Sequence, residues 1–123
     1  MILKLLYLAL AGALGTLARY GVSEVAVKVA PGYPWGTLAV NLIGCFLFGL
    51  VWSLAEYGGR LSPDARTLVL VGFMGAFTTF SSFSNDVVQM LRGERYGPAA
   101  ATFLAHNALG IGLFFAGLAL GKR

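Results

Sequence analysis

The chain has 123 residues, of which 58% are hydrophobic and only 11% are charged. A helix that crosses a bilayer needs about 20 apolar residues, so four such helices with short loops use nearly the whole length and leave no room for a soluble catalytic domain. The net charge of +4 comes from Lys and Arg residues scattered at the ends of apolar runs, which excludes a basic stripe and hence a nucleic-acid-binding protein.

Four apolar runs predict an all-α integral membrane protein that forms one domain over residues 1–123. The first run is the shortest, and its position after Lys4 would also suit a signal peptide. We favour a span, because Arg19 and Tyr20 can continue the same helix while the Lys4 amine reaches the interface. The four predicted spans are approximately 3–23, 34–56, 66–90 and 96–120.

Short connections between the spans predict an up-down-up-down arrangement. The loops then place nearly equal numbers of cations on the two sides, so the positive-inside rule gives little basis for one orientation. We expect copies to insert both ways and to pair as an antiparallel, dual-topology homodimer; the alternative is that Lys4 or Arg66 fixes one orientation. The cations on one side are Lys4, Arg60, Arg66, Lys122 and Arg123, and those on the other are Arg19, Lys28, Arg92 and Arg95.

A cluster of polar residues interrupts the third span. Six of the eight residues from Thr78 to Asn85 are polar, and at about 100° per residue they cover more than half of a helix circumference. A surface that broad cannot face lipid, so it must be enclosed by protein or line an ion route. The six are Thr78, Thr79, Ser81, Ser82, Ser84 and Asn85.

Glycines before this cluster predict that the third span is broken near its middle. Gly72 and Gly75 weaken the helix, and paired threonines compete with its backbone hydrogen bonds. A break frees carbonyls, which suit a small cation such as Na⁺, and amides, which suit an anion. Phe80 and Phe83 lie three residues apart and can turn their positive ring edges toward an anion, although plain core packing is the alternative for both.

Other polar residues within the spans are weaker candidates. The Asn41 amide can donate to an anion, but an interhelical hydrogen bond serves equally well. Arg19 can steer anions toward a pore mouth, or meet a helix C-terminus, a lipid head group or Asp86. Thr102, His106 and Asn107 form a possible polar track in the fourth span, and Cys45 is expected to be an inert buried thiol.

Three patterns resemble the CrcB/Fluc family of fluoride channels over essentially the whole chain. The last of them is highly specific, and it covers the polar cluster described above. The patterns are Gly12-x-x-Gly15-x-x-x-Arg19-Tyr20, then Gly36-Thr37-Leu38-x-Val40-Asn41-x-x-Gly44, and then Gly72-Phe73-x-Gly75-x-x-Thr78-Thr79-Phe80-Ser81-Ser82-Phe83-Ser84.

The resemblance implies an antiparallel homodimer with two fluoride pores and a structural Na⁺ at the two-fold axis. Backbone carbonyls of Gly75 and Thr78 would hold the Na⁺. The residues expected in the fluoride pore are Asn41, Thr79, Phe80, Ser81, Ser82 and Phe83. Three positions depart from the usual pattern of the family: Ser82 stands for Thr, Asp86 stands for Glu, and Ala108 stands for a serine.

The sequence therefore predicts a non-enzymatic, multi-pass protein of the plasma membrane that lets F⁻ leave the cell passively. Fluoride is small and strongly hydrated, so a selective site must offer short hydrogen bonds. A small dual-topology multidrug/proton antiporter is the alternative from another class. It would need a carboxylate embedded in the membrane, whereas the acid that follows the first span, Glu24, lies at its end.

Overall fold

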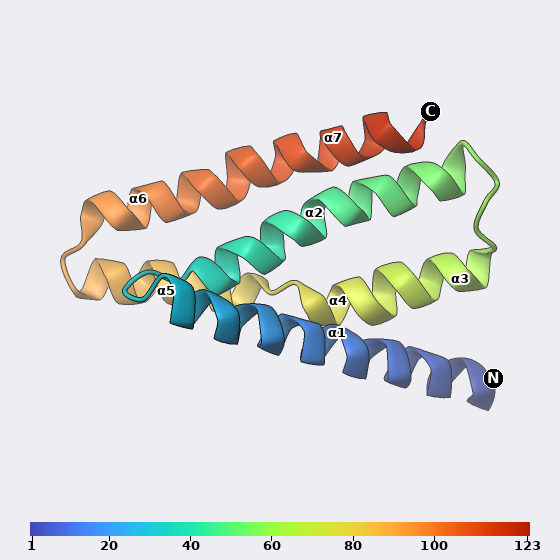
Figure 1. Cartoon of the computed structure of the whole chain (residues 1–123), viewed down its shortest axis with the longest axis horizontal. Coiled ribbons are helices and arrows are strands. Elements are labelled where there is room, and N and C mark those ends of the chain that lie inside the picture. The colour runs from blue at the N-terminus through green and yellow to red at the C-terminus, as the bar shows by residue number, and fades with distance from the viewer.

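A computed structural model describes residues 1 to 123 and contains helices but no strands. Four helical stretches are long and apolar enough to cross a membrane, and successive stretches run in opposite directions (Figure 1). The prediction of an all-α chain with four membrane-capable helices is therefore confirmed. The elements are α1 (Ile2–Val29), α2 (Trp35–Glu56), α3 (Pro63–Thr67), η1 (Leu68–Met74), α4 (Gly75–Phe77), α5 (Phe80–Arg92), α6 (Tyr96–Leu104), η2 (Ala105–Leu109) and α7 (Gly110–Gly121), where η denotes a π-helical segment.

Helix α1 is longer than the predicted first span, because it continues past residue 23 to Val29. No Gly or Pro interrupts residues 22 to 30, so nothing in the sequence ends the helix earlier. The end comes at Ala30, whose φ of −141° and ψ of 76° are extended rather than helical. The ring of Pro31 disfavours the helical conformation at the residue before it, which accounts for this boundary.

Helices α2 and α7 lie side by side with their backbones in close contact (Figure 1). A Cβ on Gly117 would collide with the Phe46 carbonyl and would lie 2.7 Å from the Leu50 nitrogen. A Cβ on Gly49 would likewise collide with the Phe114 carbonyl. These glycines allow the two backbones to touch, as small residues do at helix interfaces in membranes.

Helix α1 packs on the other side of the chain, against η1 and α4 (Figure 1). Gly15 faces the Phe73 carbonyl, and a Cβ on Gly72 would lie 2.8 Å from the Ala11 Cβ. At the end that holds both termini, the Lys4 amine donates to Asp64 at 2.7 Å and links the start of α1 to α3.

Few side chains are shielded within the single chain, since only 18 of 123 residues are buried and the outer faces of the helices are largely apolar. Lipid tails are as apolar as leucine, so outward-facing hydrophobic residues carry no penalty in a bilayer. A small core formed by Val40, Leu70, Met74 and Phe77 lies where α2 meets η1 and α4. It fixes the position of the third stretch just before the polar cluster.

Candidate functional site

Helical geometry is absent at two threonines between α4 and α5. Thr78 has φ −85° and ψ 159°, and Thr79 has φ −152° and ψ 112°, so both are extended. Figure 1 shows the thin, uncoiled segment between α4 and α5 that corresponds to them. Because helix ends carry backbone groups without helical partners, this segment presents free amides and carbonyls.

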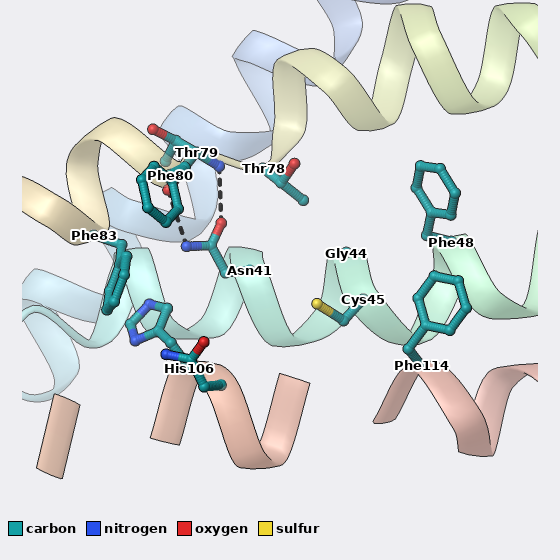
Figure 2. Close-up of a pocket in the computed structure, with 11 residues that line it drawn as sticks. Asn41, Gly44, Cys45, Phe48, Thr78, Thr79, Phe80, Phe83, His106 and Phe114 are labelled. Atoms are coloured by element: carbon teal, nitrogen blue, oxygen red, sulfur yellow. Dashed lines mark hydrogen bonds between the residues drawn. The ribbon is translucent and has the colours of Figure 1, made fainter. Parts of the chain in front are cut away.

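The side chain of Asn41 pairs with the backbone of Thr79 in both directions. The Thr79 N–H donates to Asn41 Oδ1 at 2.8 Å, and Asn41 Nδ2 donates to the Thr79 carbonyl at 3.0 Å (Figure 2). One side chain on α2 thus accepts from the Thr79 N–H, which a continuous helix would have bonded to Gly75, and also donates to the Thr79 carbonyl. The interhelical hydrogen bond considered for Asn41 is present, and it holds the extended segment in place.

Hydroxyls of the polar cluster form further hydrogen bonds around the extended segment. Thr79 Oγ1 accepts from the Ser82 N–H at 3.1 Å and caps α5, and the same oxygen lies 3.0 Å from the Ser82 hydroxyl and 3.2 Å from that of Ser81. Thr78 Oγ1 donates back to the Met74 carbonyl at 3.0 Å. The methyl of Thr78 occupies the space that a side chain on Gly44 would need.

The carbonyls of Gly75 and Thr78 remain available to a ligand. In an unbroken helix the Thr79 N–H would donate to Gly75, but here it donates to Asn41. The Thr78 carbonyl accepts no hydrogen bond. Gly75 is exposed at the surface of the chain, and no cluster of three acidic, His or Cys side chains offers another metal site. Backbone oxygens of this kind coordinate Na⁺ in discontinuous spans, so the residues present fit the predicted ion.

A cavity of about 350 Å³ lies beside the extended segment (Figure 2). It contains both predicted phenylalanines, whose ring centroids are 5.5 Å apart. Phe83 is only 6% exposed, whereas Phe80 is 78% exposed on the single chain. The lining residues are Asn41, Gly44, Cys45, Phe48, Thr78, Thr79, Phe80, Phe83, His106, Asn107 and Phe114.

Arg19 lines a second cavity, of about 250 Å³, on the other side of Thr79. The guanidinium does not pair with Asp86, because the one ion pair in the chain joins Lys4 and Asp64. Thr79 and Ser82 border this cavity too, so the predicted steering residue lies near the polar cluster. The lining residues are Thr16, Arg19, Tyr20, Ser23, Thr37, Val40, Thr79 and Ser82.

Several of these positions differ from the sequence-based expectations. Ser81 is exposed and borders neither cavity. Thr102 is fully buried and bonded to the Tyr33 hydroxyl and the Pro98 carbonyl, each at 2.7 Å, so it is absent from the proposed polar track. Thr16 and Ser23 also line the second cavity, and their spacing with Arg19, which places all three on one face of a helix, is the sequence signal that points to them.

The fourth stretch contributes His106 and Asn107 to the cavity through the π-helical segment η2. His106 Nδ1 lies 2.9 Å from the Thr102 carbonyl, and the imidazole lies against Phe83 with centroids 4.4 Å apart. The other ring nitrogen, Nε2, is enclosed without a hydrogen-bond partner. Asn107 donates to the Phe103 carbonyl at 2.7 Å.

The chain matches the family model described as CrcB-like protein, Camphor Resistance (CrcB), over residues 6–118. It is 48% identical to the Fluoride-specific ion channel FluC of Solidesulfovibrio magneticus, covering 99% of this chain and 98% of that protein. The protein of the same name from Nitrosococcus oceani is 44% identical, covering 97% and 96%. That from Agrobacterium fabrum is 42% identical, covering 91% and 90%. The resemblance to this family is confirmed.

Proposed function

This chain belongs to the CrcB-like protein family, and we propose that it is a fluoride channel through which F⁻ leaves the cell passively. The observation that carries the proposal is the 48% identity, over 99% of the chain, to a protein named Fluoride-specific ion channel. Four membrane-capable helices fit a multi-pass protein of the plasma membrane. Export needs no coupling, because a membrane potential, negative inside, drives an anion outward with about 2.3 kcal/mol per 100 mV.

The ion path runs through the cavity that contains Phe80 and Phe83. Asn41 and Thr79 fix the extended segment at its edge, so the break in the third span is itself part of the pathway. Hydroxyls and amides replace the water around fluoride one contact at a time, and phenylalanine edges carry the positive end of the ring quadrupole. Ser81 belongs to the pathway only if a second chain encloses it, since within one chain it is exposed.

The complete channel is an antiparallel homodimer of dual topology. Ser81, Asn85 and Asn107 are exposed on the single chain although they lie within apolar spans. Polar side chains at that depth avoid lipid, so a second copy covers them and closes the open side at Phe80. The near-equal cation counts of the two loop sides favour insertion in both orientations. A C-terminal reporter found on one membrane side only would reject dual topology.

A structural Na⁺ at the centre of this dimer is held by the carbonyls of Gly75 and Thr78. Gly75 faces out of the single chain, so two copies can bring their carbonyls together around one cation. The ion would supply the positive charge that offsets the free carbonyls. Exchange of Na⁺ for a bulky organic cation should then convert dimer to monomer, as measured by the mass of the detergent-solubilised protein.

The test of the proposed function is ion efflux from liposomes that contain the purified protein. We expect rapid fluoride efflux without a proton gradient and no comparable chloride efflux. Efflux that requires a proton gradient would indicate the antiporter instead. Fluoride efflux equal to that of protein-free liposomes would contradict the proposal.

A further inference from the structure

A groove of about 450 Å³ lies between the C-terminal half of α2 and the start of the third stretch. It is at the end of the chain that holds both termini, where α3 contacts α2 (Figure 1). The residues that line it are mostly apolar, and it opens to the outside of the chain at Val71, which is 66% exposed. Ligand sites commonly have volumes of about 300–1,000 Å³, so the groove is large enough for part of an apolar molecule.

Arg66 is the one charged residue that lines this groove. Its Cζ lies 3.8 Å from the centroid of the Trp52 ring, and Trp52 Nε1 in turn donates to Glu56 at 2.8 Å. The one ion pair of the chain joins Lys4 and Asp64, so Arg66 has no carboxylate partner. A guanidinium that stacks on an aromatic ring keeps the N–H groups of its edge free, and these groups bind a phosphate in a bidentate way.

The charges at this end of the chain favour an anionic ligand. Five cationic side chains lie on this side of the predicted topology, against two carboxylates. Of these carboxylates, Asp64 is paired with Lys4, and Glu56 accepts from Trp52. Trp52 is one turn from the end of α2, the depth at which aromatic residues anchor helices at the membrane surface. Basic pockets between spans at this depth bind the head groups of anionic lipids.

We propose that the groove binds one anionic phospholipid, with its phosphate on Arg66 and one acyl chain against Phe48 and Leu70. The acyl chain alone gives little preference, because lipid tails surround the helices everywhere. The contact between phosphate and guanidinium selects the lipid. Phosphatidylcholine carries a quaternary ammonium beside its phosphate, which the excess of cations repels. Lipid binding at this groove is separate from conduction through the cavity of Phe80 and Phe83.

Native mass spectrometry of the detergent-solubilised protein, titrated with phosphatidylglycerol or phosphatidylcholine of the same chain length, tests the proposal. We expect one phosphatidylglycerol per chain to bind about tenfold more tightly than phosphatidylcholine, and Arg66→Gln to remove this preference. Arg60→Gln makes the same charge change at an exposed residue outside the groove, so this control should bind like the wild type. A wild type without the preference, an Arg66→Gln variant that keeps it, or an equal loss in both variants would overturn the proposal.

A second variant tests the apolar part of the groove. Ala55 lines the groove, so Ala55→Phe should narrow it and weaken phosphatidylglycerol binding while Arg66 is unchanged. Inorganic phosphate should not displace the lipid, because it lacks the acyl chain. Unchanged lipid binding by Ala55→Phe, or displacement of the lipid by inorganic phosphate, would overturn the proposal. The same spectra count the chains, and conversion of dimer to monomer by Ala55→Phe would overturn it too, since a second copy would then occupy the groove.

Discussion

The contact between α2 and α7 and the junction between α4 and α5 are stabilised in different ways. The contact between α2 and α7 is made by glycines, and the backbones touch because Gly49 and Gly117 have no side chains. At the junction of α4 and α5, by contrast, the backbone is extended and Asn41 satisfies its free groups. The first contact is tight and largely apolar, while the second leaves the Gly75 and Thr78 carbonyls without hydrogen bonds beside a cavity. Close packing therefore needs small residues in the first region, whereas the interrupted backbone of the second needs a polar side chain from a neighbouring helix.

Leucine at Gly117 should have the largest effect, because it breaks the tight contact itself. The new side chain would collide with the Phe46 carbonyl and the Leu50 nitrogen, both of which belong to backbone and cannot move aside. Overpacking costs about 1–3 kcal/mol, occasionally more, so we expect little folded protein by size-exclusion chromatography. Leucine at Gly112, where no atom lies within 4 Å of a built Cβ, is the matched control and should fold normally.

Alanine at Asn41 should have the next largest effect, because it removes both hydrogen bonds to Thr79. The Thr79 N–H would be left unpaired, which costs about 1–3 kcal/mol. We expect a lower unfolding temperature together with reduced fluoride flux. Alanine at Gln89, an exposed residue whose contact with Asn85 is long at 3.5 Å, should change stability by less than about 0.5 kcal/mol. Equal stability of the two variants would show that Asn41 does not support the break.

Alanine at Ser53 should have the smallest effect. This variant tests whether the contact between α2 and α7 affects stability alone, without affecting fluoride flux. Ser53 is fully buried and donates to the Leu118 carbonyl at 2.9 Å across the contact of α2 with α7. Losing one such bond costs about 0.5–1.5 kcal/mol. We expect slightly lower thermal stability and unchanged fluoride flux per folded protein. A large loss of flux would mean that this contact also shapes the pathway.

The sequence predicted the four helices because long uncharged runs are a strong local signal. It also singled out Thr78 to Asn85, where hydroxyls are too many for a lipid-facing helix. It could not predict that Asn41 binds Thr79, since the partners are 38 residues apart and either an anion or a helix would suit the amide. The sequence also could not show that Thr102 is buried against Tyr33 whereas His106 lines the cavity, because both contacts join residues far apart in the chain.

The break in the third span places two carbonyls without hydrogen bonds beside the cavity of Phe80 and Phe83. The carbonyls of Gly75 and Thr78 accept no hydrogen bond within the chain, and the Na⁺ proposed for them would need a second copy. The proposed homodimer and the proposed Na⁺ involve contacts between chains, so patterns within one chain specify them only indirectly. The exposed ring of Phe80 lines the cavity and also lies on the surface that the proposed second copy would cover.

Fluoride efflux through Phe80→Ile and Phe115→Ile variants tests whether fluoride passes through the cavity beside the break. Both phenylalanines are largely exposed, at 78% and 65%, but only Phe80 lines the cavity beside the break. We expect the Phe80 variant to lose about tenfold or more of the flux, which corresponds to a barrier raised by about 1.4 kcal/mol, while its dimer persists. The Phe115 variant should conduct like the wild type. Equal flux through both variants would show that fluoride does not pass through this cavity.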